Sequence, residues 1–129
     1  MSKLIDVSCF VEWDGKLGMF ESNIIPGFSI ERVFYIFDVP DGATRANHAC
    51  MNADSIFVAI NGMVSISVEY EETELTYMLN SRTKALYVSA KSWIRAYNFS
   101  NDAVLLCLSN KVYTECEYIE DYENYKRRK

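Results

Sequence analysis

Short segments that alternate apolar and polar residues follow one another along the chain, separated by turn residues. Residues 4–11 and 29–38 are rich in β-branched and aromatic side chains, and Asp-Gly and Pro-Gly turn signals lie around them. Similar segments cover residues 85–88, 93–99 and 103–109. Turns at a spacing of about ten residues, with no long helical pattern between the strands, predict an all-β antiparallel sandwich or barrel.

The clearest local signal is the Asn61-Gly62 pair between strand patterns at residues 55–60 and 63–68. Asn-Gly adopts the positive φ angles that a two-residue type I′ turn requires, so this segment predicts a hairpin. The second strand alternates Val and Ile with Ser, which predicts one buried and one solvated face. Another hairpin is predicted around residues 71–74, with its return strand over residues 75–79.

The period of the pattern changes only near the end of the chain. Thr114 and Glu117 have the spacing of a capping box, which predicts a helix start. Residues that would then share one face of the helix are Tyr118, Ile119, Tyr122 and Tyr125. One short C-terminal helix is therefore expected to pack on the β-structure.

Composition and charge narrow the class of protein. The 129 residues are 50% hydrophobic and 24% charged, which suits one domain with a substantial core. Four of the 13 basic residues form the end of the chain, residues 126–129, and are expected to be a solvated tail after a domain of residues 1–125. Residues 1–125 contain the other nine basic residues and all 18 acidic residues, which gives them a net charge of −9. This negative charge disfavours binding to nucleic acid.

Neither a membrane segment nor a secretory signal is expected. The longest apolar run covers residues 103–108, whereas a spanning helix needs about 20 apolar residues. Charged residues follow Met1 before any apolar stretch of signal length, so we expect a cytoplasmic protein. The four cysteines form no C-x-x-C pair, and Cys9 and Cys107 are expected to be core residues.

Candidate chemistry centres on His48, the only histidine of the chain. Alternation along an extended segment places His48 and Cys50 on one face and Ala49 on the other. Tyr35, one strand earlier, can present its phenol to the same cavity. Each of these residues also has a purely structural alternative. His48 can be a surface or core residue, Tyr35 can be an aromatic residue of the β-structure with its hydroxyl at the edge of the cavity, and Cys50 can be an unreactive packing residue. Because a metal site of the histidine type needs two or three histidines, no metal or other cofactor is expected.

Taken together, several segments resemble the sugar 3,4-ketoisomerase family, the WxcM-like cupins. They occur in order over nearly the whole chain: residues 28–38 (FSIERVFYIFD), residues 45–49 (RANHA), residues 86–88 with Trp93, residues 98–100 (NFS) and residues 117–122 (EYIEDY). The resemblance implies a cupin or jelly-roll β-barrel, usually a homodimer with exchanged N-terminal strands. It also implies a metal-free isomerase that acts on a thymidine-diphosphate (dTDP) 4-keto-6-deoxy sugar for surface polysaccharides.

By the same resemblance, residues of this chain acquire expected roles in moving a carbonyl from C4 to C3. His48 is expected to be the base that removes the C3 proton, and Tyr35 to hold the sugar or steer the proton. Cys50 stands where the family commonly has a second histidine, and can shuttle a proton if Arg45 lowers its pKa. The expected substrate-binding residues are Arg45, Arg32, Arg95 and Trp93. The alternative is a catalytically silent cupin that binds a nucleotide sugar or a partner enzyme.

Overall fold

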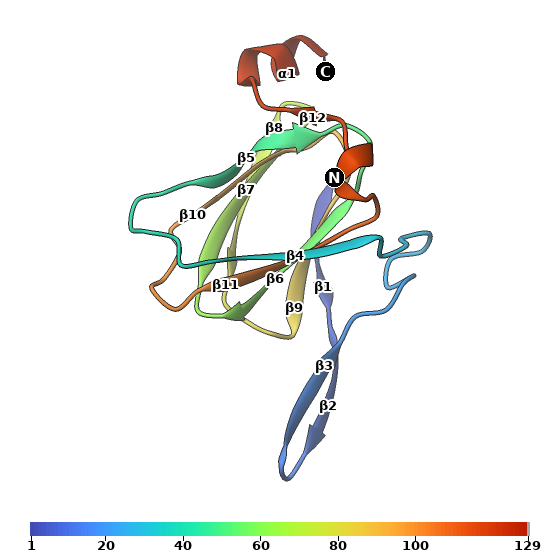
Figure 1. Cartoon of the computed structure of the whole chain (residues 1–129), viewed down its shortest axis with the longest axis vertical. Coiled ribbons are helices and arrows are strands. Elements are labelled where there is room, and N and C mark those ends of the chain that lie inside the picture. Colours follow the sequence, from blue (N-terminus) through green and yellow to red (C-terminus); the bar gives the residue numbers. More distant parts are fainter. Residues whose placement is uncertain (129) are drawn as a thin grey trace.

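Two five-stranded antiparallel sheets pack face to face in the computed structural model, which describes residues 1–128 (Figure 1). The first sheet contains, in spatial order, β1 (Ser2–Asp6), β9 (Lys84–Val88), β6 (Ser55–Asn61), β11 (Val104–Ser109) and β4 (Arg32–Phe37). The second contains β12 (Tyr118–Ile119), β5 (Arg45–Cys50), β10 (Trp93–Tyr97), β7 (Val64–Tyr70) and β8 (Thr73–Leu79). The predicted all-β jelly-roll fold with one short C-terminal helix is confirmed, although hydrogen bonds do not close the sheets into a barrel.

The turn at Asn61-Gly62 does not form the predicted hairpin. Strand β6 pairs with β9 and β11, whereas β7 pairs with β8 and β10, so the turn carries the chain from one sheet to the other. Of the two turn residues, only Gly62 has a positive φ, of 70°, whereas a type I′ turn needs positive φ at both. A Cβ atom there would lie 2.6 Å from Asp102 Oδ1 and 2.8 Å from the Ala103 Cα. The glycine is therefore required by its backbone angle and by the close approach of the neighbouring loop.

The second predicted hairpin is confirmed. Tyr70 pairs with Thr73, and both Glu71 and Glu72 between them have positive φ, as a type I′ turn requires. The predicted solvated face of β7 is wrong, because Ser65 and Ser67 are buried. Strands β8 and β10 flank β7 on both sides and carry larger side chains beside these serines.

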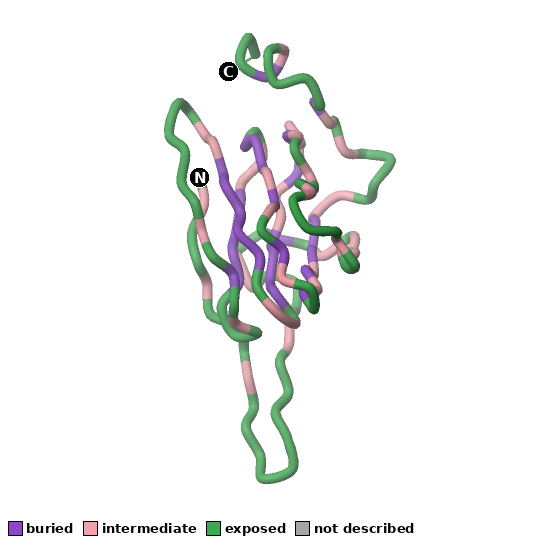
Figure 2. The backbone as a smooth tube through the Cα atoms, turned by 90° about the vertical axis from the view of Figure 1, so that its left-hand side faces the viewer, coloured by how far each residue is buried: buried purple, intermediate pink, exposed green. Residues whose placement is uncertain are grey.

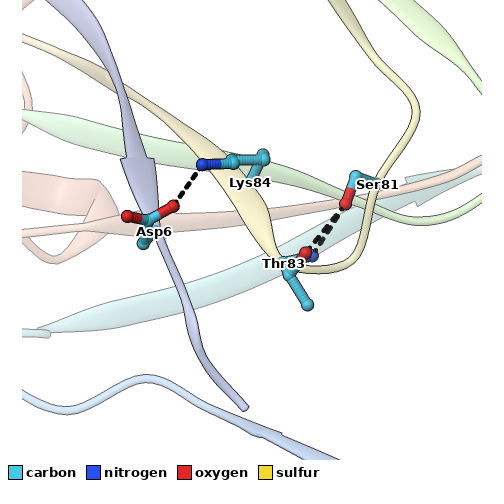
Figure 3. A network of polar contacts seen from close by, with 4 residues as sticks. All are labelled: Asp6, Ser81, Thr83 and Lys84. Carbon is cyan, nitrogen blue, oxygen red and sulfur yellow. Dashed lines mark hydrogen bonds and ion pairs between the residues drawn. The ribbon is translucent and has the colours of Figure 1, made fainter.

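The predicted strand over residues 4–11 is divided at Val7. Strand β1 pairs with β9, and an ion pair between Asp6 and Lys84 links the two strands (Figure 3). In the turn before β9, the side chains of Ser81 and Thr83 form a hydrogen bond with each other. The next strand, β2 (Ser8–Glu12), pairs only with β3 (Gly15–Met19). This hairpin extends away from the two sheets, and most of it is exposed (Figures 1 and 2).

Three apolar clusters hold the described residues together. The main core fills the space between the sheets and includes Val64, Ile66, Leu86 and Leu105. The outer face of the first sheet is covered by the segment of residues 20–30, with Phe28 as its most buried side chain. The third cluster lies on the outer face of the second sheet: Ala49, Trp93, Ile119 and Tyr125.

The helix begins later than the capping-box signature predicts. Residues 113–115 form a short 3₁₀ turn, and Tyr118 and Ile119 pair with Cys50 and Ala49 instead of joining a helix. Helix α1 (Tyr122–Arg128) follows, with the Asp121 carboxylate accepting a hydrogen bond from the Glu123 N–H at 3.0 Å.

Helix α1 includes three of the four residues predicted as a tail, 126–128, which are exposed in its last turn; Lys129 lies outside the described residues. None of the helices described is long and apolar enough to cross a membrane.

Candidate active site

A cavity of about 620 Å³ opens between the two sheets, where β4 and β5 meet the segment that leads into helix α1. Strand β4 contributes one face, with Arg32, Phe34 and Ile36 pointing inward. The opposite wall comes from β5 and β10. The remaining lining residues that bear on chemistry are Arg45, His48, Cys50, Tyr113, Cys116, Tyr118 and Glu120.

A bulge in β5 sets the direction of the histidine. Ile94 of β10 pairs with His48, whereas the next residue of β10 pairs with Ala46, so Asn47 is the extra residue. Ala46 and Asn47 both have positive φ, of 68° and 57°. Beyond the bulge, His48 lines the cavity, whereas Ala49 is fully buried on the opposite face, as the alternation predicts.

The imidazole of His48 is half-buried and is held by an aromatic contact. Its ring lies edge-on to the Tyr118 ring, with centroids 4.8 Å apart. The Nδ1 atom is buried and has no partner beyond the main chain of His48 itself. A ligand in the cavity is a natural partner for this polar ring.

Burial is the largest influence on His48 and lowers its pKa below 6.5. The Glu120 carboxylate opposes this effect by favouring the charged imidazolium, and Arg32 adds to the lowering. The ring is therefore kept neutral near pH 7 and is able to accept a proton.

The pKa of Cys50 is not lowered, as a proton-shuttling thiolate at this position would require. Burial raises the pKa of its thiol above 9.0, and the neighbouring Cys116 thiol adds to the rise, so Arg45 does not convert Cys50 to a thiolate. The Cys50 thiol donates a hydrogen bond to Asn52 Oδ1 at 3.3 Å. The cavity thus presents a neutral base and a protonated thiol from alternate positions of the same strand.

Arg32 brings positive charge to the other side of the cavity. Its guanidinium lies between the rings of Phe34 and Tyr113, 4.7 and 5.4 Å from their centroids, and donates to Tyr118 Oη at 2.7 Å. Its Nε is buried without a partner, and the ion pairs found among residues 1–128 do not include it. An uncompensated guanidinium with a free donor is suited to bind an anion.

Trp93 and Arg95 lie at outward positions of strand β10 and do not line the cavity, whereas Tyr35 lies at its edge. Tyr35 borders the cavity, but its side chain is 62% exposed and its ring stacks on Phe37 at 5.6 Å. Trp93 packs against Tyr125 of helix α1, 5.4 Å between centroids. Arg95 lies on the same outer face and contacts Glu74 Oε2 at 3.4 Å. The cavity lining therefore does not support the substrate contacts expected of Trp93 and Arg95, and the role expected of Tyr35 stays a prediction.

The sequence reasoning missed Cys116, Tyr118 and Glu120 as site residues. Tyr118 was assigned to a helix face, whereas its strand pairs with β5 and places it beside His48. The one signal for it was its position in the family-like segment 117–122. No three His, Cys, Asp or Glu side chains converge as a metal site in the part of the chain that the structure describes.

The sequence of this chain is similar to those of known proteins. A family model described as "FdtA: WxcM-like, C-terminal" matches residues 1–129. The chain is 31% identical over 98% of its length, and 91% of the relative, to TDP-4-oxo-6-deoxy-alpha-D-glucose-3,4-oxoisomerase of Aneurinibacillus thermoaerophilus.

Two solved structures share the fold throughout. WlaRA, a TDP-fucose-3,4-ketoisomerase from Campylobacter jejuni, has a TM-score of 0.92 and 34% identity, covering 99% of this chain and 95% of its own. A mutant of the 3,4-ketoisomerase QdtA from Thermoanaerobacterium thermosaccharolyticum, in complex with TDP-4-keto-6-deoxyglucose, has a TM-score of 0.92 and 28% identity, covering 98% and 92%.

Proposed function

Because the chain belongs to the FdtA family of WxcM-like proteins, we propose that it is a sugar 3,4-ketoisomerase acting on a dTDP-linked 4-keto-6-deoxyhexose. The observation that carries the proposal is the neutral His48 imidazole in a cavity that also holds the Cys50 thiol and the Arg32 guanidinium. These relatives favour an isomerase over the silent binding module that the sequence left open.

His48 is the base of the proposed reaction. The ketone at C4 acidifies the C3–H bond, and the imidazole removes that proton to leave an enediolate across C3 and C4. A positioned base of this kind contributes about 10²- to 10⁴-fold to the rate. Its lowered pKa keeps the ring unprotonated, which is the form that the step requires.

Cys50 is the acid of the proposed reaction. After a proton moves from the C3 oxygen to the C4 oxygen, C4 must receive a proton for the ketone to form at C3. Residues two apart on a strand lie roughly 6.6 Å apart and share a face. The side chains of His48 and Cys50 can therefore reach C3 and C4 of one sugar ring from the same side. The raised pKa of Cys50 keeps the proton on sulfur until it is transferred.

Arg32 and Arg45 are the proposed binding residues for the nucleotide diphosphate. Both line the cavity, and a guanidinium forms bidentate hydrogen bonds with phosphate oxygens. The TDP-sugar complex of the related QdtA mutant supports this class of ligand. The roles expected for Trp93 and Arg95 are not carried forward, because neither side chain lines the cavity.

The proposal includes a homodimer, a cytoplasmic location and a place in nucleotide-sugar synthesis for surface polysaccharides. The dimer is supported by exposed apolar side chains on hairpin β2–β3 and on the outer face of β4. Cell fractionation tests the location.

Proton NMR in heavy water tests the function. Incubation of dTDP-4-keto-6-deoxyglucose with the protein is expected to introduce deuterium at C3 and to produce the 3-keto sugar. His48→Asn is expected to abolish both. Cys50→Ala is expected to retain exchange at C3 and to slow formation of the 3-keto sugar. Saturable TDP binding by the unmodified protein without any exchange would identify a binding module instead.

A further inference from the structure

Two thiols lie on the same wall of the cavity, and the proposed isomerisation uses only one of them. Cys50 ends strand β5, and Cys116 lies between the 3₁₀ turn and strand β12. Pairing of Cys50 with Tyr118 places Cys116 two residues along the chain from that pair, and the Cys116 thiol contributes to the raised pKa of Cys50. Both sulfur-bearing residues line the cavity, and neither is bonded in a disulfide.

We propose that Cys50 and Cys116 form a reversible disulfide, so that the cavity wall is a redox modification site that switches the enzyme off. The oxidant would be a small disulfide of the glutathione class. The thiolate of one cysteine attacks that disulfide and releases one glutathione thiolate, which leaves a mixed disulfide. The second cysteine then attacks the protein sulfur, forms the internal bond and releases the second glutathione. Both protein thiols lose a proton and an electron, and the small disulfide is reduced to two thiols.

The side chain of Asn52 holds the two segments in reach of each other. Its Oδ1 accepts hydrogen bonds from the Cys50 thiol and, at 2.9 Å, from the Glu117 N–H. Its Nδ2 donates to the Glu115 carbonyl at 2.8 Å. Strand β12 is only two residues long, so the backbone at Cys116 can adjust to the Cα separation of roughly 4.4–6.8 Å that a disulfide needs.

The surroundings of this pair also favour reaction with a small anionic disulfide. The cavity volume of about 620 Å³ gives such a molecule access to both sulfurs. Arg32 places a positively charged donor 3.8 Å from Cys116 Sγ, and Arg45 lies at the same cavity. Cys107, in contrast, is fully buried in the main core and does not line the cavity.

The internal disulfide would remove the Cys50 proton from the cavity and draw Cys116 away from Arg32. The loss of activity rests on the proposed function, because it assumes that Cys50 is the acid. Formation of the bond does not. The chain offers a matched control in Cys9, a half-buried cysteine on hairpin β2–β3, away from the cavity residues.

The test treats the full-length reduced protein with glutathione disulfide and maps cysteine-containing peptides by mass spectrometry. The expected result is one intramolecular Cys50–Cys116 bond with slowed formation of the 3-keto sugar, both reversed by dithiothreitol. Cys9→Ser is expected to behave in the same way. Cys116→Ser is expected to form no internal bond and to carry glutathione adducts only.

Several results would overturn the redox site. These are free thiols at both positions after treatment, separate glutathione adducts on Cys50 and Cys116 in the unmodified protein, or a bond that forms without slowing formation of the 3-keto sugar. A bond that forms in a protein whose reduced form shows no exchange would confirm the modification site and reject the isomerase.

Discussion

The protonation of His48 is decided by its burial in the cavity wall. Burial lowers the pKa of the ring below 6.5, Glu120 partly opposes this, and Arg32 adds to it. As the proposed base, the ring must be neutral, so activity should persist at pH values where a free imidazole is already protonated. The burial of His48 thus favours the neutral ring that a base requires, which the presence of a histidine in the sequence does not by itself establish.

We therefore expect the acid limb of the pH profile of kcat/KM to have its midpoint below 6.5. Glu120→Gln should move that midpoint to still lower pH, because the carboxylate that stabilises the imidazolium is gone. The exposed Glu123 of helix α1 provides the control, and Glu123→Gln should leave the profile unchanged. A midpoint above 6.5 would remove His48 from the role of base.

Arg32 lines the cavity and Arg95 lies outside it, and this difference gives a second prediction for single residues. Arg32→Met should weaken TDP binding about tenfold or more, because one charge-assisted hydrogen-bonding group is lost from the cavity. Arg95→Met should leave the affinity unchanged, since Arg95 lies on the outer face beside Glu74. Calorimetric titration with TDP measures both, and equal losses would contradict the assignment.

At the scale of elements, the connections between strands decide which walls the cavity has. The Asn61-Gly62 turn passes the chain from β6 in one sheet to β7 in the other, and the two strands then face each other across the main core. Strand β12 extends the second sheet by two residues and brings Tyr118 to His48. The Asn61-Gly62 connection is short, and close contacts with the neighbouring loop leave little freedom to Gly62.

Gly62→Ala should therefore lower the free energy of unfolding by roughly 1–3 kcal/mol. A Cβ atom at Gly62 meets Asp102 and Ala103, and the backbone has a positive φ. Gly18→Ala is the matched control, because nothing lies within 4 Å of a Cβ atom there. Urea denaturation followed by circular dichroism measures both variants. An unchanged midpoint for Gly62→Ala would show that the loop relaxes without cost.

At the scale of the whole molecule, the exposed hairpin β2–β3 is the feature that one chain does not explain. Trp13 at its tip is 95% exposed and Val11 is 70% exposed. Isolated two-stranded hairpins are marginally stable in water, and apolar surfaces of this kind usually mark contacts between proteins. The outer face of β4 offers a second apolar surface, with Tyr35 and Phe37 exposed.

Light scattering after gel filtration is expected to give a mass of about two chains of 14.9 kDa. Trp13→Asp should shift the protein toward the monomer, because a charge at the tip of the hairpin opposes burial against a second copy. Met78→Asp changes an equally apolar, 60% exposed side chain on β8 and should leave the mass unchanged. A monomeric unmodified protein would remove the dimer from the proposal.

Local patterns were sufficient to predict most of the strands, most of the turns and the shared face of His48 and Cys50. These follow from interactions between residues close in the chain: alternation sets which side chains share a face, and Gly62 permits its turn. The family-like segments added the reaction class, because they occur in order from residue 28 to residue 122.

Which face of each strand turns inward, and which strands pair, depends instead on long-range packing. Alternation relates neighbouring side chains to one another but not to the core, so it could not show that Trp93 and Arg95 lie on the outer face of their sheet. The pairing of Cys50 with Tyr118 and the ring contact of His48 with Tyr118 join segments far apart in the chain. Such contacts form only when long-range packing selects one arrangement, and no local pattern contains that choice.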